Sequence, residues 1–89
     1  MISHATDGFW KLHDALPAKI QRQVKSAYQK FQQNPAHLSL QFKQIHQTKP
    51  IYSVRINRDY RVVGIKDGNE IIWFWVGSHS DYDKLLSRL

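Results

Sequence analysis

The sequence predicts a single α+β domain, in which an N-terminal helical hairpin packs on an antiparallel sheet of three to four strands and a short helix closes the chain. Three observations lead to this prediction. Apolar residues recur at helical spacing up to about residue 33, they alternate with polar residues from about residue 38, and an Asp-Gly pair separates two apolar runs near residue 67. At this length the core is sufficient for one domain, so we expect residues 1–89 to form a single unit.

Two consecutive helices are expected in the N-terminal third. Thr6 or Asp7 can cap the first, and Pro17 suits the first turn of the second, which should run to about Gln33, before Asn34-Pro35. The spacing of three and four residues places one apolar side on each helix. These sides carry Phe9, Leu12, His13, Leu16, Ile20, Val24, Ala27, Tyr28 and Phe31.

The period then changes to two, which is typical of half-buried strands. A first strand is expected from Leu38 to Phe42, and Lys49-Pro50 marks the turn that follows. Further strands are expected at Tyr52–Ile56 and Tyr60–Lys66, joined by the polar connection Asn57–Asp59.

The C-terminal third should contain a hairpin and a helix. Asp67-Gly68 favours a tight turn because such turns need positive φ angles, and the run from Glu70 to Val76 supplies the last strand. Its consecutive aromatic residues at positions 73 to 75 should point to alternating faces. Ser80 is the expected cap of a helix from about Asp81 to Leu89.

Composition narrows the class of protein. The chain has no cysteine, which removes disulfides and thiolate metal sites from consideration, and no apolar run long enough to span a membrane. We therefore expect a soluble, cytoplasmic protein without membrane contacts. A net charge of +6 and a pI near 9.8 favour an anionic partner such as nucleic acid or an acidic protein.

An antiparallel arrangement should gather basic residues at one end of the sheet. If the connection is the three residues 57 to 59, Arg55 falls directly opposite Arg61, with residues 77 to 79 alongside. Like charges opposite each other destabilise a sheet, so an anionic ligand would explain the pair. Lys43 could extend this basic patch. The alternative is that these residues form only a solvated face, with their stems covering aromatic surface.

His79 lies just past a glycine and before the expected helix cap, so it should be accessible. Its side chain could exchange a proton with a hydroxyl or a leaving oxygen near neutral pH, or simply make a loop hydrogen bond. Trp75 and Tyr82 could stack on a nucleobase, although core packing is the stronger expectation for them. A metal site has no signature beyond His79 and Asp81, and no cofactor is expected.

The sequence resembles the RelE/ParE superfamily of bacterial toxins from toxin–antitoxin systems. The matching segments follow the predicted helical hairpin: Phe42-Lys43, Tyr52–Arg55, Asp59–Val63 and Val76–Asp81. The last of these is similar to the end of the YafQ-like branch, whose histidine takes part in cutting messenger RNA. The resemblance covers nearly the whole chain, reduces the family's first strand to about Ile2 to Ala5, and predicts a RelE/ParE-like fold.

The resemblance implies a ribosome-dependent mRNA endoribonuclease that activates a 2′-hydroxyl against the adjacent phosphate without a metal. His79 would be the general acid or base, Arg61 would neutralise the transition state, and Arg55 and Lys43 would position the backbone. Arg58, Trp75 and Tyr82 complete the expected RNA-binding residues. Relatives place an aromatic residue after the Ser-Asp pair, whereas here Tyr82 comes one position early and Asp83 takes that place.

The implied partners are a cognate acidic antitoxin, the ribosome with its mRNA, and operator DNA bound by the toxin–antitoxin complex. Two alternatives stay open at this point. One is a non-catalytic inhibitor of DNA gyrase of the ParE kind, for which the C-terminal helix would matter more than His79. The other is an inactive relative that only binds its antitoxin.

Overall fold

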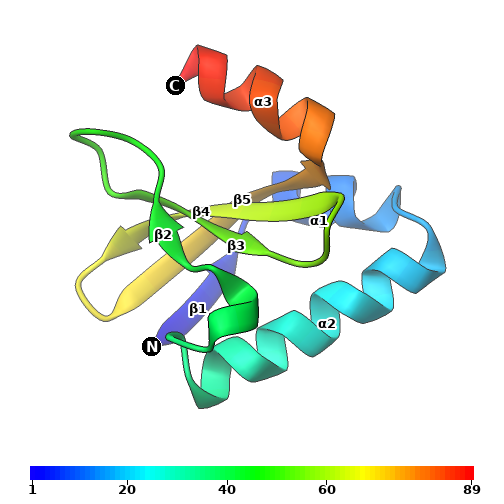
Figure 1. The fold of residues 1–89 in the computed structure, drawn as a ribbon, viewed down its shortest axis with the longest axis horizontal. Coiled ribbons are helices and arrows are strands. Elements are labelled where there is room, and N and C mark those ends of the chain that lie inside the picture. Colours follow the sequence, from blue (N-terminus) through cyan, green and yellow to red (C-terminus); the bar gives the residue numbers. More distant parts are fainter.

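The computed structural model describes residues 1–89 as a five-stranded sheet with helices on both faces (Figure 1). The strands lie in the order β1-β5-β4-β3-β2. This arrangement confirms the predicted α+β class. None of the helices is both long and apolar enough to cross a membrane. The elements are β1 (Ile2–Ala5), α1 (Asp7–Asp14), α2 (Ala18–Gln33), the 3-10 turn η1 (Leu38–Leu40), β2 (Lys43–Gln44), β3 (Ile51–Arg55), β4 (Tyr60–Asp67), β5 (Glu70–Ser78) and α3 (His79–Arg88).

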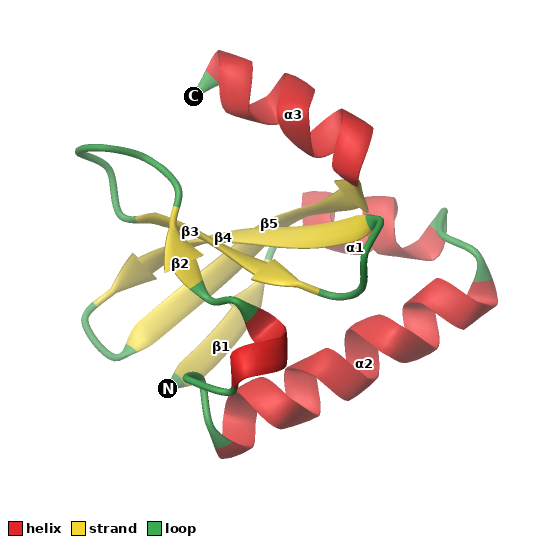
Figure 2. Ribbon diagram, in the orientation of Figure 1, coloured by secondary structure: helices red, strands yellow, loops and turns green.

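The sheet is antiparallel from β2 to β5, as predicted, and mixed only at its other edge, where β1 runs parallel to β5 (Figure 2). The pairing runs from Ile2 opposite Glu70 to Ala5 opposite Trp73. Just before the start of β5, Gly68 has a φ of 58° and allows the tight turn into this strand, as the Asp-Gly pair predicted. Four residues are too few for β1 to show a period of its own in the sequence.

The two faces of the sheet are covered by different helices, which lie on opposite sides in Figure 1. A main core of ten buried residues joins α1 and α2 to one face, and a smaller cluster of three buried residues lies under α3 on the other. The main core includes Phe31, whose ring packs edge-on against Phe42 and Trp73. The larger hydrophobic core therefore lies on the face that the helical hairpin covers.

The ends of the first two helices follow from their capping residues. Thr6 caps α1 by accepting a hydrogen bond from Phe9 N at 3.1 Å. Pro17 is the cap of α2, one position before the first-turn location expected for it, and Asn34 closes the helix as predicted. Gln21 then holds the hairpin together, because its amide donates to the main-chain oxygens of His13 and Leu16.

The strand expected from Leu38 to Phe42 is wrong. Leu38 is 90% exposed while Leu40 is buried, and both lie in η1, where the His37 side chain accepts a hydrogen bond from Ser39 N. The chain must pass from the end of α2 to the sheet here, and a capped turn delivers Leu40 and Phe42 to the main core without strand pairing. The alternating pattern therefore came from two anchoring side chains, and β2 begins only at Lys43.

The three consecutive aromatic residues of β5 do not alternate as expected. A register shift between Val63 and Gly64 pairs Val63 with Trp75 and Gly64 with Trp73. Trp73 joins the main core, whereas Phe74 and Trp75 pack against the cluster under α3. The bulge thus leaves one ring, that of Trp73, on the main-core side of the sheet and two rings, those of Phe74 and Trp75, on the side of α3.

Candidate functional site

The basic residues of β3 and β4 meet at one end of the sheet. Arg55 lies opposite Arg61, and Arg61 lies opposite Gly77, which is the register expected from the three-residue connection 57–59. Residues at directly opposed positions point to the same face, so both guanidinium groups belong to the face that carries α3. No carboxylate forms an ion pair with either arginine. The pair therefore presents uncompensated positive charge.

Arg61 is held in place by the backbone beside it. Its Nη1 donates to the main-chain oxygen of Asn57 at 2.7 Å and to that of Tyr60 at 3.0 Å. Partial burial lowers the pKa of Arg61 below its ordinary value, and the positive charge of Arg55 lowers it further. An anion bound at this point would relieve the repulsion between the two arginines.

His79 reaches the same end of the sheet from β5. It is the first residue of α3, which follows β5 without a loop, and its main-chain N–H donates to Asp59 O at 2.6 Å. The expected cap at Ser80 is wrong: Ser78 is the cap, since its hydroxyl accepts from Asp81 N at 3.3 Å. The helix therefore starts two residues earlier than expected, and His79 sits at its positive end.

The His79 ring is accessible and lies near two side chains of α3. Its side chain is 51% exposed, and its Nε2 is 3.7 Å from Asp83 Oδ1, one helical turn away. The ring centroid is 5.8 Å from that of Tyr82. An exposed imidazole at the end of the sheet that carries two arginines can exchange a proton with a substrate held there.

Tyr82 is buried at 6% exposure, with its hydroxyl donating to Ser53 Oγ at 3.3 Å. A ring enclosed to this extent offers no open face to a nucleobase, so the structure contradicts the expected stacking role of Tyr82. The sequence gave no sign that β3 carries a buried serine that receives this hydroxyl. Tyr82 thus anchors α3 to the sheet.

Trp75 is half-buried on the same face. Its indole lies over Gly77, where a Cβ would approach Cζ2 of the ring to 2.7 Å, so that only glycine leaves room for it. Its ring centroid is 6.3 Å from that of Tyr82. Part of the indole stays exposed next to the position of Arg61, and base stacking by Trp75 stays a prediction.

The remaining expected binding residues are both exposed but lie at different distances from the arginines. Arg58 belongs to the connection between β3 and β4, at the same end of the sheet. Lys43 pairs with Ser53, two positions along β3 from Arg55 and on the same face. The structure therefore brings Arg55, Arg61, His79 and Arg58 to one end, with Lys43 on the approach to it. We call these five residues the basic face.

No group of three or more histidine, aspartate or glutamate side chains is placed so that it could hold a metal ion. The pairs that do form, such as His79 with Asp83, have two members only. The basic face thus offers proton transfer and positive charge as its chemistry.

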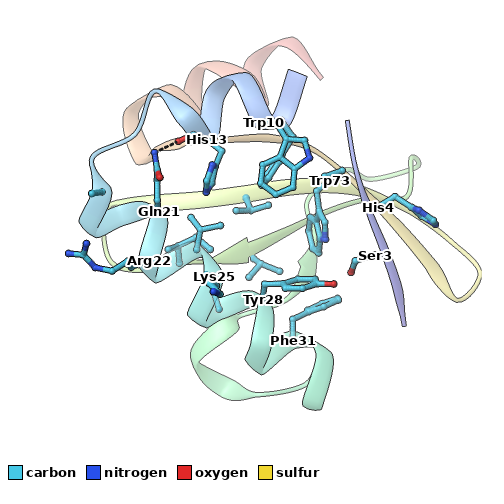
Figure 3. Close-up of a pocket in the computed structure, with 18 residues that line it drawn as sticks. Ser3, His4, Trp10, His13, Gln21, Arg22, Lys25, Tyr28, Phe31 and Trp73 are labelled. Atoms are coloured by element: carbon cyan, nitrogen blue, oxygen red, sulfur yellow. Dashed lines mark hydrogen bonds between the residues drawn. The ribbon is translucent and has the colours of Figure 1, made fainter. Parts of the chain in front are cut away.

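The opposite face carries a second feature, which the sequence did not indicate. A groove with a volume of about 740 Å³ opens between α1, α2 and the sheet, and Figure 3 shows the side chains that line it. Its walls are mostly apolar, and Trp10 and Tyr28 at its border are 49% and 39% exposed. Tyr28 was expected among the packed residues of its helix but lies at this opening instead.

The aspartate, glutamate, lysine and arginine residues that line the groove all carry the same sign of charge. Arg22 and Lys25 line it from α2, and no aspartate or glutamate does. Ser3 of β1 also lines it, and its hydroxyl is buried without a hydrogen-bond partner. An apolar groove with a cationic border is complementary to an amphipathic helix that carries acidic residues beside its apolar stripe.

The sequence pattern of the ParE-like toxin domain family matches residues 18–84. No curated protein matches the sequence. The matched segment contains α2, most of the sheet and the first part of α3, and so includes every residue of the basic face.

Solved structures share the fold over nearly the full length. One is the RelB–RelE antitoxin–toxin complex of Methanococcus jannaschii, with a TM-score of 0.73, 24% identity, and coverage of 91% of this chain and 96% of that one. YafQ of Escherichia coli gives 0.72 at 9% identity, covering 90% and 94%. The RelBE2 toxin–antitoxin complex of Mycobacterium tuberculosis gives 0.70 at 18% identity, covering 88% and 96%.

Proposed function

The chain belongs to the ParE-like toxin domain family, within the RelE/ParE superfamily of toxins from toxin–antitoxin systems, and from this premise we propose that it is an endoribonuclease that cleaves mRNA on the ribosome. The observation that supports this proposal most directly is the convergence of His79, Arg55 and Arg61 at one end of the sheet. Membership of the family alone is shared by non-catalytic toxins, so the site must support the activity.

The proposed reaction is an internal phosphoryl transfer. The 2′-oxygen of a ribose forms a bond to the adjacent phosphorus while the bond from phosphorus to the 5′-oxygen breaks, leaving a 2′,3′-cyclic phosphate and a 5′-hydroxyl. His79 either takes the proton from the 2′-hydroxyl or gives one to the departing 5′-oxygen, and water makes the other transfer. Proton transfer by a positioned side chain typically contributes about 10²- to 10⁴-fold.

The arginines would act on the phosphate. Arg61, fixed by two main-chain oxygens, is preorganised to stabilise the charge that develops on the non-bridging oxygens, and Arg55 lies directly across from it. The positive end of α3 adds to the same field. Lys43 and Arg58 would contact neighbouring phosphates, since both are exposed and neither forms an ion pair with a carboxylate.

The test is to incubate the purified protein with ribosomes paused on a defined message and to map RNA ends by primer extension. The wild type should cut at the decoding site, and His79→Ala should not. His37→Ala is the matched control, because His37 is an exposed histidine that caps η1, away from the basic face. Intact message with the wild type would overturn the proposal and favour gyrase inhibition or a binding-only protein.

We further propose that the partner is an acidic antitoxin and that it occupies the groove under α1 and α2. The solved complexes from Methanococcus jannaschii and Mycobacterium tuberculosis pair toxins of this fold with antitoxins. Here the cationic border made by Arg22 and Lys25 and the unpartnered Ser3 hydroxyl support an acidic, amphipathic occupant. Operator DNA would then be bound by the complex of the two proteins.

A further inference from the structure

Asn57 has no charge and no exposed reactive group, yet it makes more hydrogen bonds around the basic face than any other residue there. Its Oδ1 accepts from Asp59 N at 2.7 Å and from Tyr60 N at 3.0 Å. Its main-chain oxygen accepts from Arg61 Nη1 at 2.7 Å. The side chain and the backbone of one residue therefore fix both the shape of the 57–59 connection and the guanidinium of Arg61.

The same connection also holds His79. Asp59 O accepts the main-chain N–H of His79, and the position of Asp59 depends on its own N–H bond to Asn57 Oδ1. Arg61 and His79, two of the groups proposed to act on the substrate, come from different elements, β4 and α3. The connection that Asn57 shapes is the one segment to which both are hydrogen-bonded.

A third link leads to the other side of the sheet. Asn57 Nδ2 donates to Gln23 Oε1, and Gln23 belongs to α2. This is the one side-chain hydrogen bond between α2 and the connection or the strands that carry the basic face. The half-buried Asn57 therefore has both polar atoms of its side-chain amide engaged, the oxygen by the turn and the nitrogen by α2.

We infer that Asn57 is a positioning residue of the proposed ribonuclease site, which sets the geometry of Arg61 relative to His79 without touching the substrate. The inference rests on the proposed function for its catalytic consequence. Misplacing a catalytic group by about 1 Å can cost about 100-fold in rate, so a loosened connection should lower kcat. Binding of the ribosome through the exposed basic residues should change little, because those residues do not depend on the turn for their charge.

Three variants separate positioning from simple turn formation. Asn57→Ala removes every side-chain bond. Asn57→Asp keeps an acceptor for the two N–H groups and offers its second oxygen to Gln23, whose amide can turn to donate. Gln23→Ala removes only the link to α2. Lys66→Ala, at the far end of β4, is the control substitution.

Cleavage kinetics should be measured at a temperature at which each variant is fully folded by circular dichroism. We expect Asn57→Ala to lower kcat by roughly 10- to 100-fold with KM within about twofold, and Asn57→Asp to restore most of kcat. Gln23→Ala should lie between them. Unchanged kcat in fully folded Asn57→Ala would overturn the inference, as would a loss that appears only in KM.

A second measurement keeps the inference separate from the proposed activity. Amide exchange by NMR reports on the His79 N–H whether or not the protein cleaves RNA. Asn57→Ala should speed this exchange about tenfold or more, while the amide of Val63 in the centre of β4 keeps its wild-type rate. Equal His79 exchange in wild type and Asn57→Ala would overturn the inference. If the wild type does not cleave but the exchange responds, the ribonuclease proposal fails and the structural role of Asn57 stands.

Discussion

The two faces of the sheet differ in how much apolar surface they bury and in how much charge they expose. The face under α1 and α2 buries ten core residues and still leaves an apolar groove, whereas the face under α3 buries three and ends in unpaired positive charge. On the first face, packing and partner binding draw on the same apolar surface. On the second face, the arginines and the histidine of the basic face lie where few residues are buried. A charged group there stays in contact with water, so it avoids the free-energy cost of desolvation.

The largest expected effect comes from a substitution in the main core, on the face that α1 and α2 cover. Phe31→Ala should lower the free energy of unfolding by about 3 to 5 kcal/mol, because its 2% exposed ring packs against Phe42 and Trp73. Urea denaturation followed by circular dichroism measures this loss. Lys30→Ala, an exposed change on the same helix, is the control, and an equal effect of the two would show that α2 does not anchor the fold.

A substitution on the face that carries α3 should lower the cleavage rate without lowering the free energy of unfolding. Arg61→Gln should slow cleavage by about 10²- to 10³-fold, as removal of a preorganised charge stabiliser does. Single-turnover cleavage of ribosome-bound message measures the rate. Lys66→Gln, on the same strand at its other end, should cleave normally; a wild-type rate in Arg61→Gln would remove this residue from the proposed site.

Reversing the charges of α2 that line the groove tests whether the acidic partner binds there. Changing Arg22 and Lys25 together to glutamate should weaken binding of the acidic partner about tenfold or more, since like charges would then face each other. Calorimetry with the cognate acidic antitoxin measures the affinity. Reversing Lys19 and Lys30 instead changes the same net charge on the same helix outside the groove, and equal weakening by both pairs would argue against docking there.

A smaller effect concerns the anchor of α3. Tyr82→Phe keeps the ring but leaves the buried Ser53 hydroxyl without its donor, so the free energy of unfolding should fall by about 0.5 to 1.5 kcal/mol. Ser53→Ala alone should cost a similar amount. A double-mutant cycle by denaturation should show that the two losses do not add. Full additivity would mean that the hydroxyl contact contributes nothing.

The smallest effect has the opposite sign. Arg55→Gln should raise the free energy of unfolding by a few tenths to about 1 kcal/mol, because it removes a like charge directly opposite Arg61. The same change should slow cleavage. Melting curves and cleavage rates on one preparation would show stability and activity moving in opposite directions; a destabilised variant would mean that the arginine stems contribute more through packing than their charges cost.

The sequence predicted which residues of the basic face lie opposite each other, because the length of a connection sets the register of the two strands that it joins. A three-residue connection determines which residues of β3 and β4 are opposite, so Arg55 and Arg61 could be paired without coordinates. The Asp-Gly turn aligned β5 in the same way. Side-chain contacts between distant segments do not follow from the length of a connection. Nothing in the spacing indicates that Gln23 contacts Asn57 or that Tyr82 contacts Ser53.

Local exceptions explain the other differences. The bulge at Val63 and Gly64 changes which side of β5 each aromatic ring faces, and a period of two cannot show an inserted residue. Ser78 and Ser80 are equally good caps by type, and only the length of β5 decides between them. The groove was missed because helical spacing identifies apolar residues without showing whether the surface opposite them is filled.

The unpaired charges of the basic face also determine how its binding should respond to ionic strength. Arg55, Arg61, Arg58 and Lys43 form no ion pair with a carboxylate in the free protein, so each can neutralise a phosphate and release its counterion. For single-stranded RNA, four such contacts give a slope of roughly −3 in a plot of the logarithm of affinity against that of salt concentration. Attachment to an RNA chain would then weaken by more than tenfold over about a threefold rise in salt, while the apolar groove on the opposite face would keep its affinity far better.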